Sequence, residues 1–250
     1  MDKKKSKFFR KFYLIAAGMT MATSLNSQDM PAVDRINISA GTVDMYFIGH
    51  GSLMFSVNSF CIYIDPVRSS GSYDNRPKAD LILVTHEHSD HLDPALINDL
   101  RKEGTVLLCN AGSALNIPWA RIVKPGDRSV VNSITVETIE AYNIKNVRPG
   151  GQPFHPKGEG NGYIITIGDK RFYVAGDTEN TPEMKALRNI DVAFLPMNLP
   201  YTMTPEMVAD AASAFKPEIL YPYHYGNTDT AIITKLLKDS GIEVRIRNLK

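Results

Sequence analysis

The spacing of apolar and polar positions predicts that strands and helices alternate along most of the chain, after an opening made only of strands. Three short β-rich runs, separated by Gly or Asn-Ser turns, are typical of an antiparallel meander and cover residues 42–49, 52–57 and 60–66. The run "ADLILVT", residues 79–85, is continuously apolar and so predicts a strand buried on both faces. Further strands are predicted at residues 105–110, 121–126, 133–143, 191–197 and 218–224, with a hairpin at 161–178.

Helices are predicted between these strands, at residues 94–103, 181–189, 204–215 and 228–241. Two of them open with Thr-Pro-Glu, an N-cap hydroxyl followed by proline at the first helical position. No internal repeat and no low-complexity linker interrupts the alternation. We therefore expect a single α/β domain over residues 40–250.

The beginning of the chain reads as an export signal. A basic stretch, "MDKKKSKFFRKF", precedes the apolar stretch "YLIAAGMTMATSL", where Ala22 and Ser24 suit cleavage. The apolar stretch is shorter than the roughly 20 residues that a membrane-spanning helix needs. We expect a signal peptide over residues 1–28 and an exported protein, periplasmic or secreted, without stable membrane insertion. A disordered basic tail and an uncleaved short anchor are the alternatives.

Composition narrows the range of partners. The chain is 43% hydrophobic and 22% charged, which is ordinary for a soluble globular protein. Its formal charge is +1, but residues 1–24 hold six basic side chains and one acid, so the rest is mildly acidic and unsuited to nucleic acid. Cys61 and Cys109 lie in apolar runs, which predicts buried free thiols and leaves a single disulfide open.

A cluster of metal-binding side chains directly follows the most apolar predicted strand. The stretch "THEHSDH", residues 85–91, contains His86, His88, Asp90 and His91. In an extended loop His86 and His88 point the same way and can converge on one ion, while Asp90 and His91 can reach a second. Imidazole and carboxylate suit zinc, manganese or iron. The alternative, a histidine-rich surface loop that binds nothing, leaves the position after a buried strand unexplained.

The remaining candidates lie at other strand ends. His50, His155 and His224 all lie in loops after or between predicted strands, and Asp177 ends the run "FYVAGD". Because strand ends on one edge of a sheet converge, these side chains are expected to meet. The expected groups are His86, His88 and His155 on one ion, then Asp90, His91 and His224 on the other, with Asp177 as the bridge.

The pattern H-x-H-x-D-H, a later histidine, a strand-end Gly-Asp-Thr and a C-terminal strand-end histidine resemble the metallo-β-lactamase fold superfamily over about residues 40–250. The stretches "FIGHGSLMF", "YIDP" and "YPYHYGNTD" are similar to one branch, the small metal-dependent hydrolases related to ascorbate-6-phosphate lactonase and N-acyl-phosphatidylethanolamine phospholipase D. The resemblance implies a four-layer αβ/βα sandwich of two mixed β-sheets with a dinuclear site between them.

Carried over residue by residue, the resemblance implies seven metal ligands: His86, His88, Asp90, His91, His155, Asp177 and His224. In many relatives the histidine corresponding to His155 comes sooner after the preceding strand, where this chain reads "EAYN", residues 140–143. His50 resembles the branch's Gly-His turn and is expected to line the site, the alternative being a hydrogen-bonded structural histidine. Asp65 is expected to orient a ligand imidazole.

These features predict a hydrolase with two divalent ions, zinc first and manganese or iron as alternatives. A metal-bridging hydroxide would attack an ester, lactone or phosphodiester bond of a small molecule, with Asp90, Asp177 and His50 as catalytic residues. The candidate proton donors to the leaving group are Tyr142, Tyr201 and Tyr223. Three basic residues of one glycine-rich loop are candidates for attracting an anionic substrate: Lys145, Arg148 and Lys157.

Two other functions compete with this prediction. A secreted β-lactamase suits an exported member of the superfamily, but those enzymes generally lack the bridging aspartate that Asp177 would supply. A metal-binding or ligand-binding module without catalysis is the non-enzymatic alternative. The sequence leaves the oligomeric state open.

Overall fold

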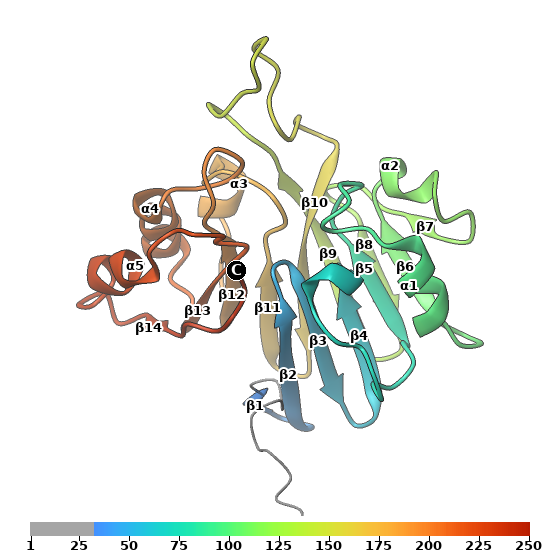
Figure 1. Ribbon diagram of the computed structural model, residues 1–250. Coiled ribbons are helices and arrows are strands. Elements are labelled where there is room, and N and C mark those ends of the chain that lie inside the picture. Colours follow the sequence, from blue (N-terminus) through green and yellow to red (C-terminus); the bar gives the residue numbers. More distant parts are fainter. Residues whose placement is uncertain (1–32) are drawn as a thin grey trace, which may run out of the picture. The chain divides into compact units, whose positions relative to one another are not determined.

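Two seven-stranded β-sheets, with helices on their outer sides, form the part of the chain that the computed structural model describes, residues 33–250 (Figure 1). The predicted signal peptide, residues 1–28, lies outside the described residues. Helices α1 and α2 lie on one side of the paired sheets and α3 to α5 on the other (Figure 1). The predicted four-layer αβ/βα sandwich with two mixed sheets is confirmed.

The first sheet contains the first seven strands in chain order, and its opening strand begins before residue 40. Strands β1 to β4 pair antiparallel and β4 to β7 pair parallel, so the predicted meander is followed by crossover connections. The bounds are β1 (Val33–Ile38), β2 (Gly41–Gly49), β3 (Ser52–Val57), β4 (Phe60–Ile64), β5 (Leu81–Val84), β6 (Val106–Cys109) and β7 (Arg121–Ile122).

The second sheet has the same plan, four antiparallel strands and then parallel ones. Its bounds are β8 (Arg128–Val131), β9 (Ile134–Ala141), β10 (Gly160–Ile167), β11 (Lys170–Val174), β12 (Val192–Pro196), β13 (Ile219–Tyr223) and β14 (Glu243–Val244). The predicted hairpin at 161–178 is the β10–β11 pair.

Short helices connect the parallel strands, and two of them begin at the predicted threonine caps. They are α1 (Pro94–Leu100), α2 (Ala111–Ala114), α3 (Pro182–Lys185), α4 (Pro205–Phe215) and α5 (Thr230–Leu236), with a 3-10 turn, η1 (Arg68–Ser70). The side chains of Thr181 and Thr204 accept hydrogen bonds from Met184 N and Met207 N, as the Thr-Pro-Glu pattern predicts. Within residues 33–250 no helix combines the length and the apolar character needed to cross a membrane.

The apolar run of β5 is buried on both faces, as predicted. Leu81 and Leu83 point into the core between the sheets, whereas Ile82 and Val84 pack in a second cluster that includes the buried side chains of α1. Cys61 and Cys109 are buried free thiols, so the disulfide is excluded. Packing on both faces holds the end of β5 in a fixed position, and the histidine-rich loop starts there.

The sequence pattern missed or misjudged mostly edge elements. Strands β1, β8 and β14 stand at sheet edges, where exposed charged residues break the apolar alternation. Strand β7 has only two residues, and both are exposed, so the strand predicted at 121–126 is largely loop. Helices α1, α3 and α5 are shorter than the predicted segments 94–103, 181–189 and 228–241, and the short helix α2 was not predicted.

The first strand is joined to the second sheet by a partly buried charge cluster. Asp34 of β1 accepts two hydrogen bonds of 2.7 Å from Nη2 of Arg247, one to each carboxylate oxygen, and a third of 3.4 Å from Nη1 of Arg245. The hydroxyl of Tyr221 on β13 also donates to it. Burial raises the pKa of Asp34, but these partners outweigh burial and hold it below its usual value.

Asp34→Asn is expected to lower the free energy of unfolding by about 2 kcal/mol at neutral pH, because two arginines lose a charged partner. The ionised carboxylate stabilises the fold above its unfolded pKa of about 3.9, so the difference from wild type should shrink as the pH falls below about 4. Urea unfolding at several pH values measures this. The control is Asp44→Asn, which breaks an exposed 3.0 Å pair with Arg35 and should cost at most about 1 kcal/mol. Equal losses for the two variants would contradict the interpretation.

Candidate metal centre

Three imidazoles meet at one point beside the end of β5. Nδ1 of His88 lies 3.0 Å from Nε2 of His86 and 3.2 Å from Nε2 of His155. His86 and His88 come from the loop after β5, and His155 comes from the connection between β9 and β10, residues 142–159, hereafter the β9–β10 loop. The structure therefore brings together the first predicted ligand group.

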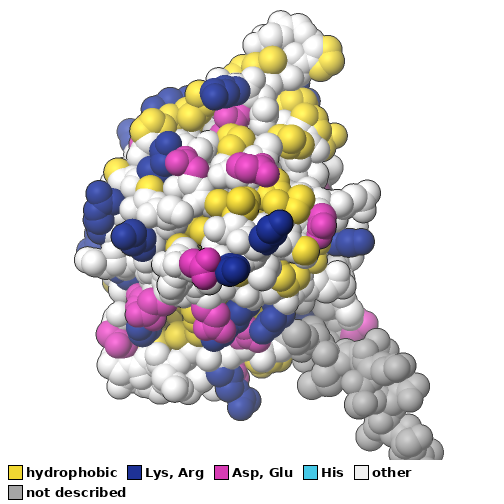
Figure 2. Space-filling view, turned by 90° about the vertical axis from the view of Figure 1, so that its left-hand side faces the viewer, with side chains coloured by type: hydrophobic (Ala, Val, Ile, Leu, Met, Phe, Trp, Pro, Cys, Tyr) yellow, Lys and Arg dark blue, Asp and Glu magenta, His cyan; other side chains and the backbone are white. Residues whose placement is uncertain are grey.

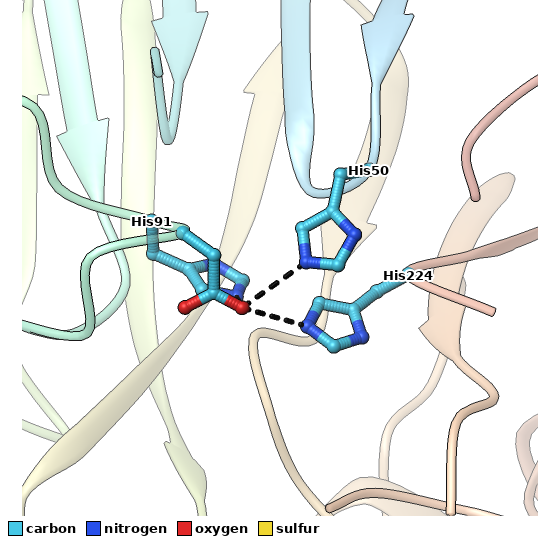
Figure 3. A group of neighbouring side chains, drawn as sticks. His50, His91 and His224 are labelled. Carbon is cyan, nitrogen blue, oxygen red and sulfur yellow. Dashed lines mark hydrogen bonds and ion pairs between the residues drawn. The ribbon is translucent and has the colours of Figure 1, made fainter. Parts of the chain in front are cut away.

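The second group gathers around the carboxylate of Asp90. Its Oδ2 lies 3.4 Å from Nε2 of His224 and 3.9 Å from Nε2 of His91. His50 belongs to this group as well, because its Nε2 lies 3.1 Å from the same oxygen. Figure 3 shows that His50, His91 and His224 approach from three separate segments: the β2–β3 turn, the loop after β5 and the end of β13.

Asp177 lies between the two groups. Its Oδ1 is 3.4 Å from Nε2 of His91, and its Oδ2 is 3.4 Å from Nε2 of both His155 and His224. It follows the end of β11, on the opposite sheet from the loop that holds His91. One buried carboxylate thus faces both sets of imidazoles, which is the position that a bridging ligand requires.

In each of three histidines the contacts of Nδ1 leave the other ring nitrogen, Nε2, free to face the centre. Nδ1 of His91 donates to Asp65 at 2.7 Å, and Nδ1 of His155 donates to the amide oxygen of Asn143 at 2.8 Å. Nδ1 of His86 lies 3.0 Å from the hydroxyl of Thr85, which donates its own proton to Asp65 at 2.7 Å. Each ring consequently presents Nε2 to the interior, the arrangement typical of metal-binding histidines.

Buried polar atoms at the centre lack partners among the described residues. They are Nε2 of His91, Oδ1 of Asp177 and both ring nitrogens of His224. Burying such atoms without a hydrogen bond or a ligand costs about 1–3 kcal/mol each. A divalent cation would satisfy them together, since neutral imidazole and carboxylate are the ligands that zinc and similar metals accept. The donor set therefore fits a metal site.

The charge distribution also favours a cation. Burial lowers the pKa of His155 to about 4 and that of His86 well below its usual value, so both rings are neutral at pH 7. Burial raises the pKa of Asp177, but the imidazoles around it outweigh burial and keep it ionised. For His91, the nearby Asp177 and Asp65 outweigh burial and raise the pKa to about 9, so a metal ion would compete with a proton at its Nε2.

Three residues at the centre have a strained backbone: two histidines of the second group and the aspartate that accepts from His91. His50, Asp65 and His224 have φ values of 50°, 44° and 46°, in the left-handed region that residues other than glycine rarely adopt. Each follows the end of a strand, β2, β4 or β13. Such strain costs on the order of 1–3 kcal/mol per residue and is concentrated at functional sites. The tight turns aim all three side chains inward.

Sequence reasoning missed the residue that positions His155. Asn143 receives both the backbone N–H and Nδ1–H of His155 on its amide oxygen, each at 2.8 Å, and donates to the carbonyl of Tyr201 at 2.8 Å. The buried carboxylate of Glu179 holds the same turn by accepting from the backbone of Lys145 and Asn146. The sequence feature that could have indicated Asn143 is its position in "EAYN", where a polar residue follows the end of a strand.

A cavity of about 380 Å³ opens onto the centre, between the loop after β5 and the β9–β10 loop. Side chains of both ligand groups line it, together with Ser89, Arg148, Phe154, Asn198 and Tyr201. Of the three tyrosines considered as proton donors, only Tyr201 lines this cavity. Interspersed charges cover the face on the side of α4 and α5, and no histidine is seen there (Figure 2), so the centre opens elsewhere.

Asn143→Ala is expected to weaken metal binding about 10- to 100-fold, because His155 loses the acceptor that fixes its ring. Competition with a chelator of known affinity measures the loss. Asn146→Ala is the matched control: it lies in the same loop and donates to the carbonyl of Thr202 at 2.7 Å, yet contacts no histidine. Equal weakening by both substitutions would mean that the conformation of the loop, and not the contact between Asn143 and His155, determines the metal affinity.

Comparisons with known proteins agree with this geometry. A family model described as a beta-lactamase superfamily domain matches residues 44–224. A UPF0173 metal-dependent hydrolase from Symbiobacterium thermophilum is 31% identical over 215 residues, which is 80% of this chain and 90% of the relative. The structure of a candidate metal-dependent hydrolase from Parabacteroides distasonis is 44% identical, covers 88% of this chain and 100% of its own, and has a TM-score of 0.84.

A more distant structure extends the likeness in fold alone. The metallo hydrolase Igni18 from Ignicoccus hospitalis is 24% identical, covers 83% of this chain and 95% of its own, and has a TM-score of 0.68. The family match spans the strands and loops that carry His86, Asp177 and His224. The chain therefore belongs to the beta-lactamase superfamily, within its family of metal-dependent hydrolases.

Proposed function

We propose that this protein is a dinuclear metal-dependent hydrolase acting on an ester, lactone or phosphodiester bond of a small molecule. The observation that carries the proposal is the position of Asp177, whose carboxylate lies 3.4 Å from His155 of the first group and 3.4 Å from His91 and His224 of the second. A single ion would leave one of these groups without a cation. The predicted signal peptide supports the further proposal that the enzyme works in the periplasm or outside the cell.

Two ions would be held by the two groups and by Asp177 between them. The first group is His86, His88 and His155. The second would bind its ion through Asp90, His91 and His224, while His50 of the same group is left for the substrate. When bound, divalent ions acidify water and polarise carbonyl or phosphoryl oxygens. We propose zinc, with manganese or iron as alternatives that the same ligands accept.

His50 is proposed as the residue that holds a proton for the leaving group. Its Nδ1 faces the main-chain oxygen of Lys250 at 2.9 Å and its Nε2 faces Oδ2 of Asp90 at 3.1 Å. Oxygen atoms thus face both ring nitrogens. The cavity reaches His50, so the proton at Nε2 is within reach of a bound substrate.

Asp90 is proposed to orient the reacting groups. Its carboxylate contacts His50 and His224 and has a side chain that is 48% exposed, which places it at the surface of the cavity. Burial raises the pKa of Asp90, but the neighbouring imidazoles of His224 and His50 outweigh burial and keep the carboxylate ionised. The carboxylate therefore stays available as an acceptor at neutral pH.

Reconstitution tests the dinuclear proposal. We expect two equivalents of zinc, manganese or iron per chain by mass spectrometry, and loss of hydrolysis when a chelator removes them. His86→Ala and His224→Ala should each lose about one equivalent of metal. Asp177→Ala should weaken the binding of both ions. A panel of phosphodiester, lactone, ester, thioester and amide substrates identifies the bond. One ion per chain would contradict the dinuclear site, and full occupancy without hydrolysis would favour a non-enzymatic module; turnover of nitrocefin alone would favour a β-lactamase.

His50→Gln is expected to keep the metal content and to lower kcat by about 100-fold for substrates with poor leaving groups. Substrates that release p-nitrophenolate need no proton, so their kcat should fall far less. Steady-state kinetics on a matched pair of esters or phosphodiesters separates the two cases. An equal decrease for both leaving groups would assign His50 to ligand binding or to positioning rather than to proton donation.

A further inference from the structure

Only one of the three basic residues considered for the β9–β10 loop faces the cavity. Lys157 is paired with Glu183 at 2.7 Å and packs over the ring of Tyr142. The side chain of Lys145 does not line the cavity, whereas Arg148 does. Among the residues that line it, Arg148 is the single Lys or Arg. The sequence could not make this distinction, because all three residues lie within thirteen positions of one loop.

The guanidinium of Arg148 is held over the cavity and has donors to spare. It packs on the face of Phe154, with 5.1 Å from its central carbon to the ring centroid, and donates from Nη2 to the Phe154 carbonyl at 3.3 Å. Its backbone N–H bonds to the carbonyl of Gln152 at 2.7 Å, which closes the tip of the loop. No described carboxylate pairs with it. An arginine has five N–H donors, so several remain for a ligand.

Part of the cavity lining is aromatic. Phe154 and Tyr201 meet edge to face with 5.1 Å between ring centroids, and Tyr201 is 45% exposed. The side chain of Asn143 donates a hydrogen bond to the backbone carbonyl of Tyr201. This contact attaches the β9–β10 loop to the segment after β12 that carries Tyr201. In Figure 1 the β9–β10 loop extends beyond the sandwich above the strand ends. A ligand bound here would contact a fixed cation and an apolar surface at once.

We propose that Arg148 binds an anionic group of the substrate, a carboxylate or phosphate that is separate from the bond being cleaved. The substrate is then an organic anion whose apolar portion lies against Phe154 and Tyr201. Arginine binds both kinds of oxyanion through paired N–H donors, and its charge offsets the repulsion that Asp90 and Asp177 exert on an anionic ligand. This inference rests on the proposed hydrolase function and gives that function a substrate class.

Equilibrium binding tests the inference without requiring turnover. The probes are monocarboxylates and dicarboxylates of equal chain length, from butyrate and succinate to hexanoate and adipate, together with the corresponding phosphonocarboxylates. Dissociation constants are measured by NMR titration on the protein loaded with zinc. At the best chain length the second anionic group should tighten binding about tenfold or more in the wild type. The second anionic group, carboxylate or phosphonate, that lowers the dissociation constant more indicates which kind of anion Arg148 prefers.

Matched variants assign the gain to one residue. Arg148→Ala should abolish the advantage of the second anionic group, Arg148→Lys should keep part of it, and Lys145→Ala should leave it unchanged because that side chain lies outside the cavity. The inference is overturned if Arg148→Ala keeps the advantage, or if no diacid binds more tightly than its monoacid. Failure of the hydrolase proposal would be seen separately, as missing metal or missing turnover in the wild type.

Discussion

The buried carboxylate of Asp65 is the contact on which the candidate centre depends. It lies just after β4, fully buried, and accepts hydrogen bonds from the backbone and hydroxyl of Thr85 and from the ring of His91. A buried charge is tolerated only when its partners satisfy it, so β4, the end of β5 and the histidine-rich loop must keep their relative positions. The orientation of two imidazoles, those of His91 and His86, follows from this one group.

The two sheets contribute to the centre in the same way. Each sheet ends its antiparallel part and begins its parallel part near the middle, and the functional side chains follow the strands at that change. In the first sheet these are β4 and β5. In the second, Asp177 follows β11 at the change, and His224 follows β13, which lies two strands away on the parallel side. Neither sheet has a complete ligand set. Packing of the two inner faces therefore assembles the site as well as the core.

Much of the fold and of the candidate site was predictable, because the informative patterns are local. Continuous apolar runs identify the central strands, and His86, Asp177 and His224 each follow such a run directly. The resemblance to a known superfamily supplied the sandwich, which periodicity alone does not distinguish from other α/β arrangements. Edge strands such as β8 were missed because half of their residues face solvent.

What the sequence could not provide depends on contacts between distant segments. Arg148 and Lys157 differ in their surroundings because Glu183, on α3, pairs with Lys157 and not with Arg148. The inclusion of His50 in the second group depends on a tight turn after β2 that no spacing rule describes. Asn143 supports His155 only because the β9–β10 loop folds back on its own start. Each of these is a tertiary pairing, which composition and periodicity leave undetermined.

The β9–β10 loop joins two properties that many enzymes keep on separate segments. His155, which faces the metal ligand groups, and Arg148, which faces the cavity, lie in the same short segment and are braced by the same turn. Insertions, deletions or substitutions that reshape the loop for a new substrate would therefore also displace His155. We therefore expect a change of specificity through this loop to keep the contact between Asn143 and His155.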